Sequence, residues 1–153
     1  MLNNDILRSL RYSLDIGDGE VAAIAQLAGQ ALTAPEVADL LRRDDEAGYR
    51  ECPDEVLARF LDGLIIHRRG RDESRPLPPL ELPLDNNHIL KKLRVAFELR
   101  DNDLLAVLDA AGLIMTKGEL NALFRAPGHD NYRPCGDQIL RNFLKGLTAR
   151  LRG

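Results

Sequence analysis

Apolar residues recur every three or four positions through eight short segments of the chain. The four segments of the first half contain Ile6, Leu7, Leu10 and Leu14; Val21, Ile24, Ala25 and Leu27; Val37, Leu40 and Leu41; and Val56, Leu57, Phe60, Leu61 and Leu64. Those of the second half contain Ile89, Leu90, Leu93 and Phe97; Leu104, Val107 and Leu108; Leu120, Leu123 and Phe124; and Ile139, Leu140, Phe143, Leu144 and Leu147. This spacing gathers apolar side chains on one face of a helix, and no stretch alternates with the period of a strand. The pattern predicts an all-α chain.

The second half of the chain repeats the first. Residues 3–70 align without a gap on residues 86–153, at a constant offset of 83 positions, and more than a third of the aligned residues are identical. Self-similarity over this length indicates a tandem duplication. We therefore predict two four-helix repeats, residues 1–70 and 86–153, which pack as one body about a pseudo-twofold axis.

Prolines are concentrated between the repeats, in residues 71–85. This segment holds Pro76, Pro78, Pro79 and Pro83, which are four of the eight prolines in the chain. Proline removes backbone hydrogen-bond donors and favours an extended polyproline II path. We interpret the segment as a stiff linker, and a Pro-x-x-Pro ligand for a recognition domain, from Pro76 to Pro79, is the alternative.

Polar residues at the expected helix starts predict where several helices begin. Thr33-x-x-Glu36 and Thr116-x-x-Glu119 have the spacing of a capping box, in which each side chain satisfies a free backbone amide. Asparagine and aspartate are also preferred as N-caps. The expected caps of the first two helices of each repeat are Asn4, Asp18, Asn87 and Asp101.

A glycine interrupts the last helix of each repeat at the same place, as Gly63 and Gly146. Glycine inside a helix costs about 1 kcal/mol relative to alanine. Its presence in both copies predicts the close approach of another helix, either within the repeat or between the repeats.

Composition narrows the class of protein. The 153 residues (17.1 kDa) are 44% hydrophobic and 29% charged, which excludes collagen-like, disordered and disulfide-stapled chains. No apolar run approaches the roughly 18 residues of a membrane span, and the first residues lack the features of a signal peptide. Two cysteines in such a chain predict free thiols in the cytoplasm. A net charge of −3 argues against a wholly basic nucleic-acid binder.

Four sequence segments together resemble the YehS-like family. They are Leu2-Asn3-Asn4-Asp5-Ile6-Leu7-Arg8-Ser9, Arg69-Gly70-Arg71-Asp72-Glu73-Ser74, Asn131-Tyr132-Arg133 and Cys135-Gly136-Asp137-Gln138. Members of the YehS-like family are small bacterial proteins built from two copies of a domain of unknown function. The resemblance covers essentially the whole chain and implies a soluble, helical, tandem-domain protein, but it brings no catalytic residues.

The motifs of common catalytic and cofactor sites are absent from the sequence. There is no Gly-rich phosphate loop, no His-Glu-x-x-His, no Cys-x-x-Cys and no Gly-x-Ser-x-Gly. We therefore predict neither enzymatic activity nor a cofactor. A metal site can be drawn from His129, Cys135 and either Asp130 or Asp137, but the first repeat has Glu46 at the position of His129, so the duplication does not support it.

A polar loop, Tyr-Arg-x-Cys-x-Asp, precedes the last helix of each repeat. Its members are Tyr49, Arg50, Cys52 and Asp54, and Tyr132, Arg133, Cys135 and Asp137. As a binding corner, the loop would offer a stacking tyrosine, an arginine for phosphate or carboxylate, and a thiolate stabilised by a helix N-terminus. As a structural element, which we favour, it would contain a buried cysteine, an aspartate facing the free amides of the last helix, and two side chains that tie down the loop.

Net charge separates the two repeats. Residues 1–70 carry 8 basic and 13 acidic residues, a net charge of −5, whereas residues 85–153 carry 11 and 8, a net charge of +3. Arginine accounts for 17 of the 21 basic residues, which favours planar recognition of phosphate or carboxylate. If a polyanion binds, the expected contacts are Lys91, Lys92, Arg94, Arg141 and Lys145, supported by Arg133.

These observations predict a non-catalytic adaptor or regulatory module that binds another macromolecule, with a protein as the expected partner. No nucleophile, base and orienting group stand together in the sequence as an enzyme would require. The alternative is a nucleic-acid-binding protein that acts through the basic second repeat, residues 86–153.

Overall fold

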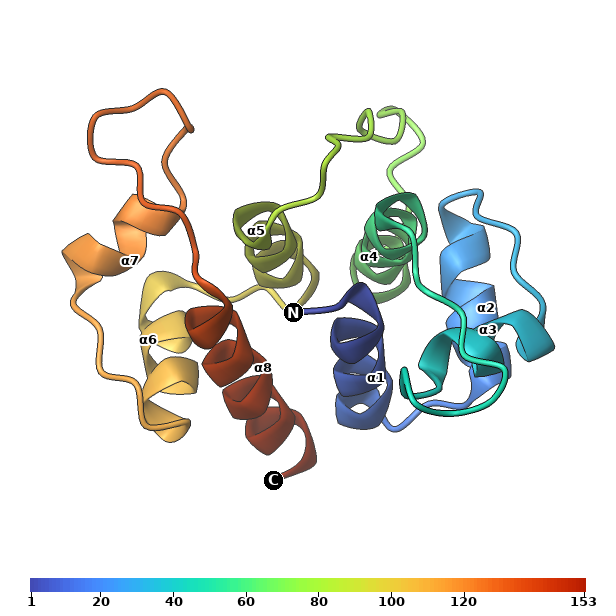
Figure 1. Cartoon of the computed structure of the whole chain (residues 1–153). Coiled ribbons are helices and arrows are strands. Elements are labelled where there is room, and N and C mark those ends of the chain that lie inside the picture. The colour runs from blue at the N-terminus through green and yellow to red at the C-terminus, as the bar shows by residue number, and fades with distance from the viewer.

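The computed structural model describes all 153 residues and contains eight helices and no strands (Figure 1). The first repeat forms α1 (Asn3–Leu14), α2 (Asp18–Leu27), α3 (Ala34–Leu41) and α4 (Asp54–Arg69). The second forms α5 (Asn86–Ala96), α6 (Asp101–Ala110), α7 (Lys117–Leu123) and α8 (Asp137–Arg152). The prediction of an all-α chain with four helices in each repeat is confirmed. None of these helices is both long enough and apolar enough to cross a bilayer.

The third helix of each repeat begins with the predicted capping box. The Thr33 hydroxyl accepts a hydrogen bond from the Glu36 N–H at 3.2 Å, and the Glu36 carboxylate accepts one from the Thr33 N–H at 3.0 Å. Thr116 and Glu119 form the same two bonds, at 3.1 and 3.0 Å. These bonds satisfy backbone amides that the first turn of a helix leaves free. The same bonds hold the pKa of both glutamates below its usual value.

The first helix of each repeat is not capped as predicted. α1 begins after Leu2, and α5 begins after Asp85, whose carboxylate accepts a hydrogen bond from the backbone N–H of His88 at 2.8 Å. Asn4 and Asn87 lie within the first turns of these helices. Their side chains do not cap the helices and instead form hydrogen bonds to a loop that is distant in the sequence.

The second helices begin at the residues that were predicted to cap them, and their actual caps lie one residue earlier. The residues that precede α2 and α6 are Gly17 and Arg100. Asp18 and Asp101 are therefore the first residues of the helices, where a negative charge still interacts favourably with the helix dipole.

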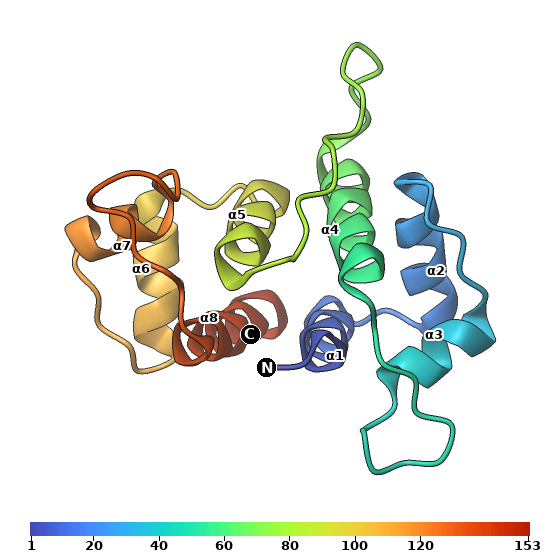
Figure 2. The same ribbon diagram turned by 45° about the horizontal axis from the view of Figure 1, so that its top comes forward.

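Four helices form the centre of the molecule: α1 and α4 from the first repeat, and α5 and α8 from the second. α1 packs along α8 and α4 packs along α5, whereas α2 with α3 and α6 with α7 lie on opposite outer sides (Figures 1 and 2). One continuous cluster of 29 buried residues extends through both repeats and includes the equivalent side chains Phe60 and Phe143. Because apolar burial is the main driving force of folding, the two repeats form one body.

Two hydrogen bonds link the last helix of each repeat to the residues just before the first helix of the other repeat, and they are related by the pseudo-twofold axis. The Asp54 carboxylate accepts a bond from the backbone N–H of Leu84 at 3.0 Å. Its counterpart Asp137 accepts one at 2.8 Å from the amino group of Met1, which is the position equivalent to Leu84. This bond and a second one from Asn86 hold the pKa of the Asp137 carboxyl below its usual value.

Two ion pairs across the interface obey the same symmetry. Arg69 lies 3.2 Å from the carboxylate of Glu98, and the equivalent Arg152 lies 3.5 Å from that of Asp15. Glu98 and Asp15 lie just after α5 and α1 and adopt the left-handed backbone conformation, with φ of 52° and 54°. L-residues rarely adopt this conformation, so its presence at equivalent positions shows how closely the two repeats match.

Gly63 and Gly146 lie at helix crossings within each repeat. A Cβ atom added to Gly63 would lie 1.9 Å from the carbonyl oxygen of Ile24 in α2. One added to Gly146 would lie 1.9 Å from the carbonyl oxygen of Val107 in α6. The predicted close approach of another helix is confirmed, and the neighbouring helix belongs to the same repeat.

Residues 71–85, here called the strap, contain no helix and connect α4 to α5 along one side of the centre (Figure 2). Arg59 of α4 donates a hydrogen bond to the carbonyl oxygen of Pro78 in the strap at 3.2 Å. A cavity of about 220 Å³ lies between the strap and the two helices. Its apolar lining includes Ala58, Ile65, Pro78, Pro79, Leu80, Leu84 and Val95. The strap thus covers the α4–α5 side of the molecule.

Candidate functional site

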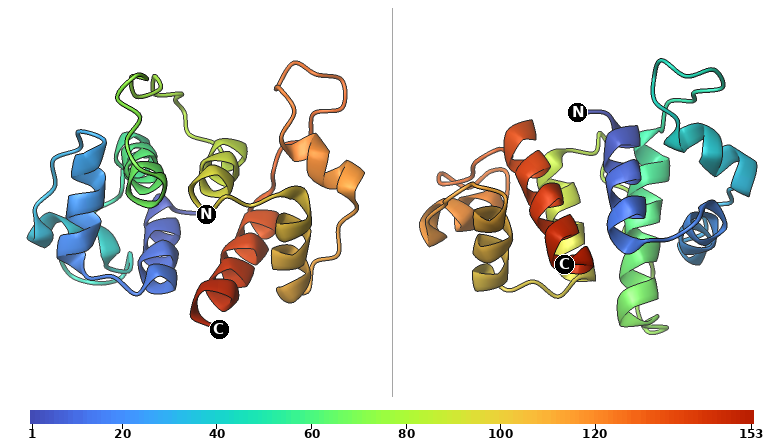
Figure 3. Two further views of the ribbon diagram at one scale, coloured as in Figure 1. Left: turned by 180° about the vertical axis from the view of Figure 1, so that it is seen from behind. Right: turned by 90° about the horizontal axis from the view of Figure 1, so that it is seen from below.

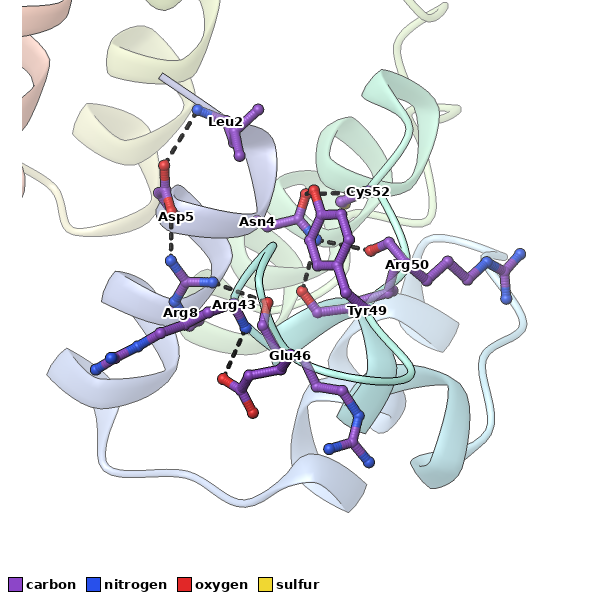
Figure 4. Close-up of polar contacts among 11 residues, drawn as sticks. Leu2, Asn4, Asp5, Arg8, Arg43, Glu46, Tyr49, Arg50 and Cys52 are labelled. Carbon is purple, nitrogen blue, oxygen red and sulfur yellow. Dashed lines mark hydrogen bonds and ion pairs between the residues drawn. The ribbon is translucent and has the colours of Figure 1, made fainter.

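The polar loop of the first repeat is organised around Asn4, which is fully buried (0% exposed) (Figure 4). Its amide nitrogen donates hydrogen bonds to the carbonyl oxygens of Leu40 and Arg50, both at 2.8 Å. Its side-chain oxygen accepts bonds from the backbone N–H of Cys52 at 3.0 Å and from the hydroxyl of Tyr49 at 3.3 Å. One side chain in α1 therefore holds the end of α3 and the start of α4 in place.

Asn87 performs the same task in the second repeat. Its amide nitrogen donates to the carbonyl oxygens of Leu123 and Arg133, at 2.9 and 3.0 Å. Its oxygen accepts a bond from the backbone N–H of Cys135 at 2.8 Å. Sequence analysis missed this role, although the repeated Asn-Asn pair marked both positions.

The arginines and aspartates of the two loops also bond within the protein. Arg50 lies 3.4 Å from Glu36 of α3, and Arg133 lies 3.8 Å from Glu119 of α7. Both pairs lie at the surface, where an ion pair contributes little to stability.

Asp54 and Asp137 were predicted to face the free amides of the last helices, and that detail is wrong. The carboxylate of Asp54 accepts a hydrogen bond from the side-chain amide of Asn3 at 2.7 Å, and Asp137 accepts the equivalent bond from Asn86 at 2.8 Å. Their second oxygens accept the bonds across the repeat interface described above. Each aspartate therefore connects its last helix both to the first helix of its own repeat and to the chain just before the first helix of the other.

The geometry of both cysteines contradicts a reactive thiolate. Cys52 and Cys135 are buried and free. Burial raises the pKa of the Cys52 thiol to about 12 and that of Cys135 to about 11, because the charged form loses its solvation. The structural interpretation of the loop is therefore the one that fits the contacts.

We expect both thiols to react slowly with a disulfide reagent at pH 8 in the native protein. A raised pKa leaves only a small fraction as thiolate, which is the nucleophilic form. Cys135 should react first, since it is slightly more exposed than Cys52 (6% against 2%). The measurement is the labelling rate of Cys52→Ala and Cys135→Ala variants, with urea-unfolded protein as the fully reactive reference. Rapid native labelling of either thiol would contradict this prediction.

Three of the six basic residues proposed for polyanion binding are occupied by other groups. Lys92 forms an ion pair with Asp62, Arg94 lies 2.7 Å from Asp101, and Arg133 is paired with Glu119 as described. Arg94 also donates to the carbonyl oxygen of Leu99 at 3.1 Å and therefore stabilises the turn between α5 and α6. These residues are held by internal contacts.

The other three predicted residues, Lys91, Arg141 and Lys145, are exposed and form no ion pair. They do not form one cluster, because Lys91 lines the cavity under the strap, whereas Arg141 and Lys145 lie one turn apart on α8. The predicted six-residue site is thus divided over separate parts of the surface.

Asp62 is a buried charged residue (3% exposed) that sequence analysis did not single out. It lies in α4 between Arg59, at 3.1 Å, and Lys92 of α5. Its counterpart in the second repeat is Lys145, and the counterpart of Lys92 is Ser9. The ion pair that joins α4 to α5 therefore has no equivalent between α8 and α1.

A surface depression of about 800 Å³ lies beside the junction of α5 and α6. Its lining residues include Arg69, Arg94, Arg100 and Lys117, but Glu98 and Asp101 also line it. Arg69 and Arg94 are paired with these carboxylates, so most of the local positive charge is neutralised.

The metal site considered from the sequence is not assembled. No three His, Cys, Asp or Glu side chains lie close enough together to hold a metal ion. His129 instead accepts a hydrogen bond from the backbone N–H of Asn131 at 3.0 Å and lies near Arg125 at the surface.

Comparison with known proteins gives a consistent result. A family model described as "Protein of unknown function (DUF1456)" matches twice, at residues 3–70 and 86–153. The chain is 48% identical over 150 residues to the "Uncharacterized protein YehS" of Escherichia coli (strain K12), covering 98% of this chain and 96% of that protein. No solved structure matches the fold. The two matched segments are those that align with each other and form the two four-helix repeats, and the chain belongs to this YehS-like, tandemly duplicated DUF1456 family.

Proposed function

We propose that the protein is a non-catalytic adaptor or regulatory module that binds another macromolecule, with a protein as its partner. The proposal is supported by where the two repeats differ. Most buried apolar positions keep an apolar residue in both repeats, as Phe60 and Phe143 do, but two positions that are buried in α4 correspond to exposed cations in α8. On α8, Arg141 and Lys145 replace Ala58 and Asp62 of α4.

Two further features agree with this proposal. The polar residues that recur in both repeats are engaged in bonds inside the protein, which leaves the diverged surface for recognition. The equivalent cysteines Cys52 and Cys135 are buried and form no disulfide. Free cysteines are typical of proteins in a reducing compartment, so we propose that the protein acts in the cytoplasm.

The test is affinity capture from bacterial lysate, with and without nuclease treatment. The bait is the wild-type chain or the double variant Arg141→Glu/Lys145→Glu, whose exposed positions leave the fold intact. We expect a protein partner that survives nuclease and is depleted with the variant bait. Absence of any partner that survives nuclease would contradict the adaptor proposal.

Nucleic-acid binding is the second candidate function, and the free cations Lys91, Arg141 and Lys145 favour it. Three phosphate contacts predict a slope of log affinity against log salt of about −2 for single strands and about −2.7 for duplex DNA. We expect Lys91→Glu/Lys145→Glu to flatten the slope, whereas Arg43→Glu, an exposed charge in the first repeat, should leave it unchanged. A salt titration against random-sequence RNA and DNA measures this. Absence of binding at about 50 mM salt would exclude this function.

A further inference from the structure

The pseudo-twofold axis gives the molecule two equivalent helix pairs, α4–α5 and α8–α1. The strap crosses the first pair. Seen from below, α1 and α8 lie side by side and no loop passes over them (Figure 3, right). The structure therefore contains one helix pair that carries an extended segment and an equivalent pair that carries none.

The side chains under the strap have clear counterparts on the other pair. We call the residues under the strap the covered face: Ala58, Asp62, Ile65, Lys92 and Val95. Their counterparts, the open face, are Arg141, Lys145, Thr148, Ser9 and Tyr12. The covered face is thus apolar around one neutralised ion pair, whereas the open face is polar and cationic.

The cations of the open face form no ion pair with nearby acids. Asp5 and Asp15, at the two ends of α1, are paired with Arg8 and Arg152. Asp137 lies one turn before Arg141 on α8 and interacts with its charge, but its ion pair is with the amino group of Met1. Two positive charges are therefore left free on a chain whose net charge is −3. An anionic partner is the complement of this face.

The open face also presents an apolar ring to solvent. Tyr12 is 58% exposed, and the guanidinium of Arg152 lies over its ring at 4.2 Å. Arg152 also donates to the carbonyl oxygen of Tyr12 at 2.8 Å, so both side chains are held in place. An exposed and fixed aromatic ring is a typical contact for a proline ring or another flat apolar group.

The strap shows how an extended chain can be held at such a face. Arg59 of α4 donates to the carbonyl oxygen of Pro78. Its counterpart on α8 is Asn142, whose side-chain oxygen accepts a bond from Gln138 at 3.1 Å and whose amide nitrogen can donate. A main-chain carbonyl laid over α8 would therefore meet a donor at the equivalent place.

We propose that the open face binds an acidic, extended, proline-containing segment of a partner protein, laid across α8 and α1 as the strap is laid across α4 and α5. Carboxylates of the segment pair with Arg141 and Lys145, its backbone accepts a bond from Asn142, and an apolar residue packs on Tyr12. The inference rests on the proposed adaptor function and specifies its surface and the chemistry of its partner.

The test measures fluorescence anisotropy of a labelled peptide of about ten residues that alternates proline with glutamate, which favours an extended conformation. Binding is measured at low salt, where exposed charges are least screened. We expect Arg141→Glu/Lys145→Glu to weaken binding by about tenfold or more, since two exposed ion pairs are lost. Tyr12→Ala should weaken it as well. The peptide with glutamine in place of glutamate should not bind.

A matched control carries the same change of charge elsewhere. Lys117→Glu/Arg125→Glu reverses two exposed cations at α7, on the outer side of the second repeat, and should leave peptide binding unchanged. Equal loss in both double variants would overturn the proposal, because only net charge would then matter. Tighter binding of an oligothymidine of equal length, lost in the α8 variant, would assign the face to nucleic acid. A wild-type chain that binds no peptide but still captures a partner through Arg141 and Lys145 would overturn this inference and leave the adaptor function standing.

Discussion

Replacing Gly63 or Gly146 with alanine is expected to lower the free energy of unfolding by about 3 kcal/mol or more. The added methyl carbon would lie 1.9 Å from a backbone carbonyl oxygen of the neighbouring helix, at Ile24 or Val107. A backbone atom cannot rotate away as a side chain can, so α2 or α6 must shift as a whole. Urea denaturation of the two variants and the wild-type protein measures the loss.

The control for this prediction is Gly118→Ala in α7. Gly118 is exposed, and no atom lies within 4 Å of the position that a Cβ would occupy. Here the higher helix propensity of alanine should act alone and stabilise the protein by about 0.5–1 kcal/mol. Gly63→Ala and Gly146→Ala variants as stable as the wild type would show that the crossings are not tightly packed.

Replacing Asn4 with alanine is expected to cost about 3 kcal/mol or more, because it removes four hydrogen bonds at once. The carbonyl oxygen of Leu40 and the N–H of Cys52 would lose their partner in a buried place where water cannot replace it. The carbonyl oxygen of Arg50 would lose its partner in a partly buried place. Asn87→Ala should cost less, since Asn87 is partly exposed and water can reach its partners. Thermal and urea unfolding of both variants tests the order.

Asn131→Ala provides the matched control for the asparagine variants. The side chain of Asn131 is exposed and makes no hydrogen bond within the protein, so the change should alter stability by less than about 0.5 kcal/mol. A loss for Asn4→Ala no larger than that of the control would show that the buried network does not stabilise the loop.

Much of this fold was predictable from the sequence because the interactions behind it join residues close in the sequence or occur in both repeats. Helical spacing of apolar residues follows from helix geometry, and the Thr33 and Thr116 capping boxes bond within four residues. The glycine contacts were predictable because glycine destabilises a helix interior and yet occurs at the same position in both repeats. Close packing of another helix explains why it is kept there.

The remaining features depend on partners far away in the sequence. Asn4 fits an N-cap by its position, but its bonds reach residues 36 to 48 positions away, which spacing cannot reveal. Lys92 looked like a free cation until the fold placed it beside Asp62, 30 residues earlier. Candidate surface charges are therefore the least predictable part, because their availability depends on acids contributed by other helices.

At the centre of the molecule, α1 packs on α8 and α4 packs on α5, so each repeat is completed by a helix of the other. The chain therefore has the architecture of a homodimer whose two subunits are covalently joined. The first helix of each repeat packs on the last helix of the other, so a single repeat lacks the apolar surface that covers these two helices in the whole chain. A separate repeat would regain this surface only by pairing with a second copy through an isologous twofold interface. In the joined chain the closing contacts link residues as far apart as Ser13 and Thr148. Contacts between residues so far apart in the sequence form slowly, so we expect the docking of the two repeats to limit the folding rate. Because the repeats share one core, we expect unfolding in one cooperative transition.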